Sequence, residues 1–140
     1  MQADFRILVA DDHGIVRMGL IQVIKQLKPH AQLSEVEDYK SLHSIISKER
    51  FDLAIIDVNM PNGTLQQAID FIRIKQPDLK ILVFSAQDEN LYALRYLKMG
   101  ADGFLNKLST KDQIDQALTA MVQKGRFISE EIKESLFSET

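Results

Sequence analysis

Two kinds of segment alternate along the chain. Five short apolar runs have the length of β-strands and lie at residues 5–10, 33–37, 52–57, 80–85 and 102–106. After each run, apolar residues recur at every third or fourth position, a spacing typical of helices that bury one face. The helical sets are Ile15, Leu20, Val23, Ile24 and Leu27; Leu42, Ile45 and Ile46; Leu65, Ala68, Ile69 and Ile72; Leu91, Leu94 and Leu97; and Ile114, Ala117, Leu118 and Met121. The pattern predicts strands and helices in strict alternation.

This alternation predicts an α/β fold, a three-layer doubly wound domain around a five-stranded parallel sheet. Parallel neighbours need a crossover connection, and a helix usually provides it. The first, third and fourth runs are almost wholly apolar, as expected of strands that are covered on both faces. The second run, "LSEVE", alternates and carries acids, which places it at an edge. Right-handed crossovers then favour the strand order 2-1-3-4-5.

Composition and charge narrow the class of protein. The chain has 140 residues, of which 45% are hydrophobic, enough for one core. It contains no cysteine, which excludes disulfides and thiolate metal sites and is compatible with the cytoplasm. No signal-peptide pattern occurs, and no apolar run approaches the ~18 residues that span a bilayer. A net charge of −3 without a basic stripe argues against direct DNA binding by this chain.

Polar residues stand at the ends of four of the apolar runs. Asp11 and Asp12 follow the first run, Asp57 ends the third, Ser85 ends the fourth and Lys107 follows the fifth. The carboxyl ends of parallel strands share one edge of the sheet, and ligands bind where the strand order reverses. We therefore expect all five side chains on one rim.

Three carboxylates on one rim repel each other. Two unit charges ~4 Å apart cost about 4 kcal/mol at an effective dielectric constant of 20. A hard divalent cation offsets this cost, and oxygen ligands favour Mg²⁺ over zinc or copper. A lysine and a hydroxyl that face the same cation are suited to phosphoryl oxygens. The grouping predicts a magnesium site for phosphoryl chemistry.

Each residue taken alone has a simpler explanation. Asp12 could cap the first helix. Asp57 could end a strand before the turn residues of "VNMPNG", and Lys107 could be a solvated lysine. Surface or packing roles are expected of the histidines, which show no metal-ligand spacing with one another: His13, His30 and His43. The occurrence of acids, a hydroxyl and a lysine together at the strand ends favours a functional site over these separate explanations.

The motifs "ILVADDH", "DLAIIDVNMP", "ILVFSA" and "MGADGFLNK" resemble the response-regulator receiver domain of two-component signalling. The stretches "DDHGIVRMGL" and "GADGFLNKLST" are most similar to the nitrate/LuxR-type regulators, whose receivers precede a helix-turn-helix DNA-binding domain. The resemblance implies a receiver over residues 1–124. Residues 125–140 are then a short helix, with Ser129 as N-cap and apolar Ile132, Leu136 and Phe137, or the start of a linker to an absent effector domain.

The resemblance implies a role for each rim residue. Asp57 accepts a phosphoryl group from the phosphohistidine of a sensor histidine kinase, and Ser85 and Lys107 bind the acyl phosphate. The protein is then a signalling phosphoacceptor and not an enzyme, because it catalyses only its own phosphorylation and dephosphorylation. Mg²⁺, or Mn²⁺, is held directly by Asp12, Asp57 and the main-chain carbonyl of Asn59, and through water by Asp11.

Ser85 and Phe104 form the switch that this resemblance implies. Phosphorylation draws Ser85 inward, and the ring of Phe104 fills the vacated space and remodels the surface used for homodimerisation or effector docking. Phe104 lacks the hydroxyl of the tyrosine common in receivers. Asn59 and Gln87 flank the site and tune the lifetime of the phosphoryl group. Leu108 replaces the usual proline, which favours a trans peptide bond.

Two other functions remain open at this point. A haloacid-dehalogenase-type phosphatase also uses an aspartyl nucleophile, Mg²⁺, a hydroxyl and a lysine, but it needs a second acid where this chain has Asn59. A receiver-like module that acts through protein contacts alone needs no phosphoryl chemistry. Retention of all five rim residues favours the phosphoacceptor.

Overall fold

The computed structural model describes residues 5–129 and 132–134. Its elements follow the predicted alternation: β1 (Arg6–Ala10), α1 (Gly14–Leu27), β2 (Gln32–Val36), α2 (Tyr39–Lys48), β3 (Leu53–Asp57), α3 (Leu65–Lys75), β4 (Lys80–Ser85), α4 (Glu89–Met99), β5 (Gly103–Asn106) and α5 (Lys111–Lys124). The sheet has the order β2-β1-β3-β4-β5, and all neighbouring strands are parallel. The predicted fold class and strand order are confirmed.

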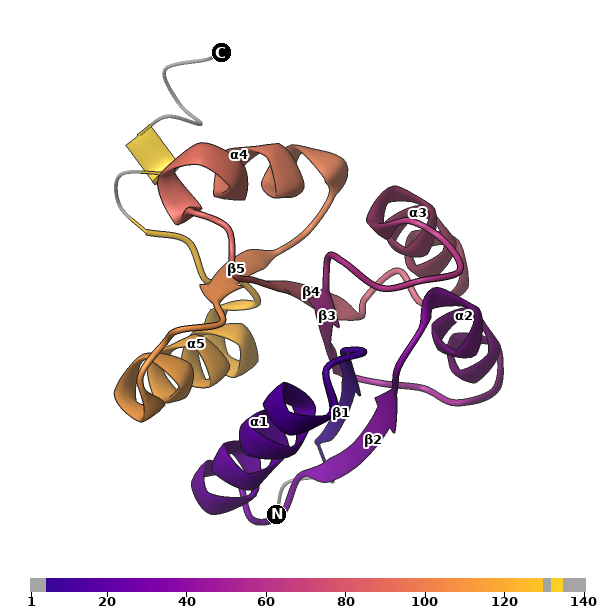
Figure 1. The fold of residues 1–140 in the computed structure, drawn as a ribbon, viewed down its shortest axis with the longest axis horizontal. Coiled ribbons are helices and arrows are strands. Elements are labelled where there is room, and N and C mark those ends of the chain that lie inside the picture. The colour runs from indigo at the N-terminus through magenta and orange to yellow at the C-terminus, as the bar shows by residue number, and fades with distance from the viewer. Residues whose placement is uncertain (1–4, 130–131, 135–140) are drawn as a thin grey trace.

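Helices cover both faces of the sheet. Helices α1 and α5 lie on one face, and α2, α3 and α4 lie on the other (Figure 1). Alternate residues of β1 enter the two cores, since Leu8 packs on the side of α2 and α3 and Val9 packs on the side of α1. Every residue of β3 is buried, whereas β2 is partly exposed at the edge. Burial on both faces explains the continuous apolar run that ends at Asp57.

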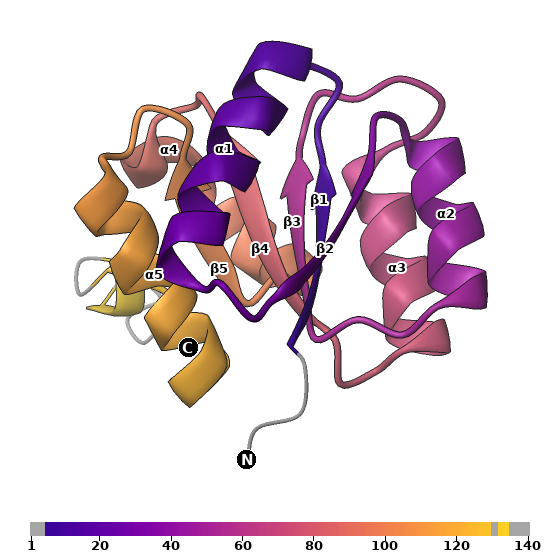
Figure 2. The ribbon, with the colours of Figure 1, turned by 90° about the horizontal axis from the view of Figure 1, so that it is seen from below.

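Two residues that the apolar spacing predicts on buried helix faces are exposed, Ile15 of α1 and Leu91 of α4. Ile15 is 83% exposed, because the first turn of α1 lies beyond the carboxyl ends of the strands (Figure 2). Leu91 is 73% exposed, and α4 buries Ala93 and Tyr96 against the sheet instead. Of the leucines predicted to face the core, Leu97 packs against it, whereas Leu91 faces solvent.

Side-chain caps fix where the last two helices begin. Thr110 caps α5 in a reciprocal arrangement with Gln113. Asp88 caps α4 by accepting a hydrogen bond from the Asn90 amide at 2.8 Å. Helix α4 thus begins independently of Ser85 at the end of β4, whose hydroxyl contacts Gln87.

The segment after α5 packs against the edge strand β5. Phe127 forms a parallel bridge with Gly103, and its carbonyl accepts a hydrogen bond from the Phe104 amide at 3.3 Å. A Cβ atom on Gly103 would lie 2.9 Å from that carbonyl oxygen, so the close approach requires glycine. The Ser129 hydroxyl accepts from the Ile132 amide at 3.3 Å, and Ile132 is buried in the core. The predicted apolar residues Leu136 and Phe137 lie outside the described residues.

Two further sequence expectations concern the backbone and the membrane. The Lys107–Leu108 peptide bond is trans, as predicted, since the structure has no cis peptide bond in its described residues. Among the same residues, no helix has both the length and the apolar character needed to cross a bilayer.

Gln76 ties the end of α3 to the connection between α2 and β3. Its side chain is buried; the amide nitrogen donates to the carbonyls of Ile46 at 2.9 Å and Glu49 at 2.6 Å, and the amide oxygen accepts from the Phe51 amide at 3.0 Å. These bonds satisfy three backbone groups far from the carboxyl ends of the strands.

We expect Gln76→Leu to lower the free energy of unfolding by about 2–4 kcal/mol, because it leaves buried backbone groups without partners. Urea unfolding measures this loss. The matched control is Gln22→Leu on the exposed face of α1, for which we expect a change within about 0.5 kcal/mol. Equal losses in the two variants would contradict the assignment.

Candidate functional site

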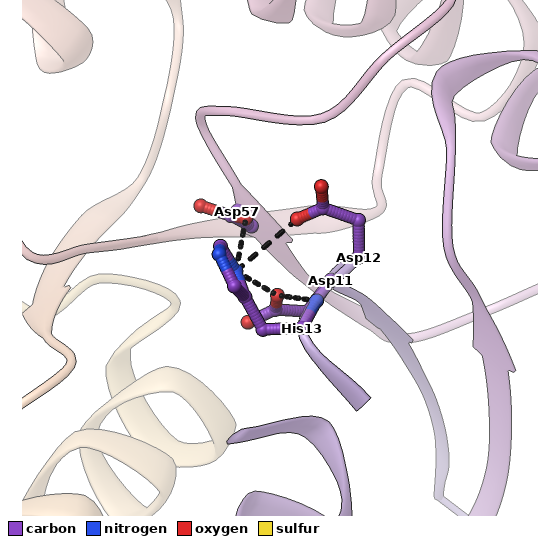
Figure 3. Close-up of side chains that lie close together, drawn as sticks. All are labelled: Asp11, Asp12, His13 and Asp57. Carbon is purple, nitrogen blue, oxygen red and sulfur yellow. Dashed lines mark hydrogen bonds and ion pairs between the residues drawn. The ribbon is translucent and has the colours of Figure 1, made fainter. Parts of the chain in front are cut away.

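The acids predicted to share one rim meet at the carboxyl ends of β1 and β3. Ligand atoms of Asp11, Asp12, His13 and Asp57 all lie within 4.8 Å of one another. Figure 3 shows these side chains converging from the end of β1 and the end of β3. The parallel register pairs Ala10 with Ile56, so the next residue of each strand carries its carboxylate to the same point.

Lys107 supplies positive charge to this cluster. Its ammonium nitrogen lies 3.2 Å from an oxygen of Asp11 and 3.2 Å from an oxygen of Asp57. The side chains of Asp11 and Asp57 are 1% and 2% exposed, whereas that of Asp12 is 33% exposed. One ammonium group thus faces two buried carboxylates, and the third carboxylate of the cluster, that of Asp12, lies nearer the surface. The cluster keeps an excess of negative charge.

The surroundings of Asp57 act in opposite directions on its carboxyl group. Burial raises the pKa of Asp57, the Asn59 amide that donates to it at 3.2 Å lowers the pKa, Asp11 raises it and Lys107 lowers it. The net direction is upward. Burial is the largest of these influences, because it disfavours the charged form of the carboxyl group.

Two buried carboxylate oxygens of this site have no hydrogen-bond partner among the described residues. They are one oxygen of Asp11 and one of Asp57, both shielded from water. Lys107 forms an ion pair with that oxygen of Asp11, but the contact lacks hydrogen-bond geometry. Unsatisfied buried oxygens are rare in folded proteins. They fit a hard divalent cation, since such ions take carboxylate oxygens as ligands.

His13 belongs to the cluster, which its spacing from the other histidines did not indicate. Its Nδ1 atom lies 3.2 Å from oxygens of both Asp11 and Asp12 and 3.7 Å from an oxygen of Asp57. The ring is exposed, as expected of a surface residue, but it faces the acids. Direct sequence adjacency to Asp12 was the one available signal. His43 does have a packing role, stacked on Phe71.

The idea that Asp12 caps the first helix is wrong. Helix α1 begins at Gly14, and its N-cap is His13, whose side chain makes no capping hydrogen bond. Since the helix starts one residue later than this idea requires, the Asp12 carboxylate turns toward the other acids instead of the helix amides.

Ser85 and Phe104 are connected through α4. Ser85 is 1% exposed, and its hydroxyl donates to the side-chain oxygen of Gln87 at 3.1 Å and accepts from the Gln87 amide at 3.0 Å. The same Gln87 oxygen accepts from the Tyr96 hydroxyl. Phe104 is buried and lies parallel to the ring of Tyr96, with centroids 6.2 Å apart. Sequence reasoning did not single out Tyr96.

Two more residues that sequence reasoning missed support the backbone of the site. The Tyr39 hydroxyl donates to the carbonyl of Val58 at 2.8 Å and to that of Asp57 at 3.2 Å. Arg17 donates to the carbonyl of Asp11 at 2.5 Å. Neither contact could be inferred from spacing, because each joins residues from different elements. Together they fix the chain on both sides of the acidic cluster.

Known proteins share this fold and somewhat more than a quarter of the aligned sequence. The chain is 28% identical over 134 residues to the transcriptional regulatory protein DegU of Brevibacillus brevis, covering 96% of this chain and 57% of that protein. It superposes with a TM-score of 0.77 and 27% identity on the signal receiver domain of NarL from Mycobacterium tuberculosis, covering 88% of this chain and 99% of that one. For a LuxR-family two-component response regulator from Aurantimonas sp. SI85-9A1, the TM-score is 0.81, with 27% identity and 98% coverage of both chains.

These relatives confirm the resemblance to the nitrate/LuxR-type regulators. The chain spans less than two thirds of the length of the curated relatives, 57% in DegU and 62% in the oxygen regulatory protein NreC of Staphylococcus epidermidis. The sequence profile of the response regulator receiver domain matches residues 7–119. The carboxylates, the lysine and the hydroxyl described above therefore stand on the receiver fold, and the chain belongs to the family of response regulator receiver domains.

Proposed function

We propose that Asp57 accepts a phosphoryl group from the phosphohistidine of a sensor histidine kinase. One observation carries this proposal: Asp57 ends a fully buried strand, 3.2 Å from the Lys107 ammonium, and has a carboxylate oxygen without a hydrogen-bond partner. That oxygen attacks phosphorus, the P–N bond breaks, and its electron pair returns to the imidazole of the kinase. The product is an acyl phosphate on Asp57.

Lys107 and Ser85 are the proposed ligands of the transferred group. The ammonium of Lys107 already lies beside Asp57 and would attract the phosphoryl oxygens by charge. The Ser85 hydroxyl would donate to another phosphoryl oxygen after it releases Gln87. Both groups act on charge that develops during transfer.

The residues of the cluster fit Mg²⁺, or Mn²⁺, as the accompanying ion. Asp12, Asp57 and the main-chain carbonyl of Asn59 would hold it directly, and Asp11 would hold it through water. When bound, the ion supplies positive charge that offsets the three carboxylates and the phosphoryl oxygens. Asp11 and Asp12 then serve to place that charge beside Asp57.

The family consists of signalling proteins, and we propose that the chemistry of this chain is limited to its own phosphorylation and dephosphorylation. Asn59 is exposed next to the site, and Gln87 is bound to Ser85, so both are placed to influence how water reaches the acyl phosphate. We propose that they set its lifetime. The relatives, which are response regulators, favour this role over a phosphatase.

The output of the switch is also a proposal, because the chain spans only part of the curated relatives. We propose that residues 1–124 act as the receiver and that residues 125–140 lead to a helix-turn-helix domain, with regulation of transcription through homodimerisation. One related structure is described as RcsB of Salmonella enterica serovar Typhimurium bound to a promoter. Family membership also supports the cytoplasm as the place of this exchange.

Incubation with phosphoramidate and Mg²⁺ tests the phosphoacceptor. Intact-mass spectrometry should show one added phosphoryl group on the wild type and none on Asp57→Asn, because the amide lacks the anionic nucleophile. The matched control is Asp78→Asn, at an exposed aspartate, which should be modified like the wild type. An unmodified wild type would contradict the proposal, and modification of Asp57→Asn would assign the nucleophile elsewhere.

Asp12→Asn should weaken Mg²⁺ binding by about tenfold or more, because it removes one anionic ligand. Isothermal titration calorimetry with MgCl₂ measures the affinity. The Asp12 side chain is one-third exposed, so the variant should stay folded, and Asp78→Asn again serves as the control. Unchanged affinity in Asp12→Asn would remove Asp12 from the ligand set.

A further inference from the structure

Two hydroxyl groups converge on one atom, the side-chain oxygen of Gln87. One is that of Ser85, at 3.1 Å, and the other is that of Tyr96 from α4. The Gln87 carbonyl also accepts from Asn106 at 3.1 Å, so the residue is anchored at both its backbone and its side chain. These bonds hold Gln87 in one position, in which its side-chain oxygen accepts a hydrogen bond from the Ser85 hydroxyl.

Ser85 has one hydroxyl proton, and that proton is engaged by Gln87. The proposed phosphoryl ligand of Ser85 lies on Asp57, so the serine can donate to it only after the bond to Gln87 is broken. The oxygen of Gln87 cannot follow the serine freely, because Tyr96 also donates to it. Tyr96 therefore favours the orientation of Ser85 that exists before phosphorylation.

Tyr96 is well placed to act in this way. Its side chain is buried, and desolvation raises the pKa of its hydroxyl, which remains a protonated donor at neutral pH. Its ring lies between those of Tyr92 and Phe104, with centroid distances of 6.4 Å and 6.2 Å. Phe104 carries no hydroxyl. The aromatic hydroxyl that donates to Gln87 therefore belongs to Tyr96 of helix α4 and not to a residue of strand β5.

We propose that Tyr96 is a positioning residue which, through Gln87, holds Ser85 in its unphosphorylated orientation and so limits how readily Asp57 enters the phosphorylated state. This inference rests on the proposed function, because it concerns the regulation of the same site. Loss of the Tyr96 hydroxyl leaves Gln87 with Ser85 as its remaining side-chain donor. The restraint on Ser85 is then weaker, and the phosphorylated arrangement becomes more populated.

Beryllofluoride, a mimic of the phosphoryl group, tests this proposal in the presence of Mg²⁺. Its affinity is measured by fluorine NMR on the full chain, so the readout is binding and not turnover. Tyr96→Phe keeps the ring and its stacking and should bind beryllofluoride roughly 2- to 10-fold more tightly, the range expected for one lost hydrogen bond. Tyr92→Phe is the matched control on the same helix and should bind like the wild type.

A second variant separates positioning from a general effect on packing. In a Gln87→Met background, the acceptor shared by Ser85 and Tyr96 is gone, so Tyr96→Phe should cause no further change. An affinity of Tyr96→Phe equal to or weaker than that of the wild type would overturn the proposal, as would the same gain with and without Gln87. Failure of the wild type itself to bind beryllofluoride would instead show that the proposed function is wrong.

Discussion

Mutual repulsion among three carboxylates is the constraint on which the rest of the site depends. Strands β1 and β3 are parallel and in register, so their carboxyl ends deliver Asp11 and Asp57 to the same point, and Asp12 follows in the chain. Burial of Asp11 and Asp57 limits how far water screens their charges. One lysine, brought by the end of β5, offsets part of the repulsion. The negative charge that Lys107 does not offset favours the binding of a cation. The fold creates this excess of charge, because it brings the carboxylates together.

In contrast to the acids, the polar groups around Gln87 have hydrogen-bond partners. Ser85, Gln87 and Tyr96 exchange hydrogen bonds with one another, and the aromatic ring of Tyr96 continues into the core beside Phe104. A polar network with its donors paired favours one defined arrangement. The receiver thus combines carboxylates that repel one another with hydroxyl groups that are hydrogen-bonded. A new anion at Asp57 would offer Ser85 a second hydrogen-bond acceptor besides Gln87.

The sequence was sufficient for the strands and their order, because burial on both faces leaves continuous apolar runs and every observed strand lies within one residue of its predicted run. Topology alone also predicted that the three acids and Lys107 lie close together, as they do. The sequence did not predict correctly which way some helical side chains face, or the residue at which α1 begins. Ile15 and Leu91 face solvent, and the cap of α1 is His13 rather than Asp12. Contacts such as that of Tyr96 with Gln87 join different elements and leave no periodic signal.

The missing side chain at Gly103 has a consequence for how this domain meets other chains. The last strand of an open sheet exposes unpaired backbone groups, which can recruit a strand from another molecule. Here the chain's own Phe127 occupies that position, and it can do so because nothing projects from Gly103 toward its carbonyl. A hydrogen in place of a methyl group at Gly103 therefore lets the chain itself pair with backbone groups of the β5 edge that another strand could otherwise use.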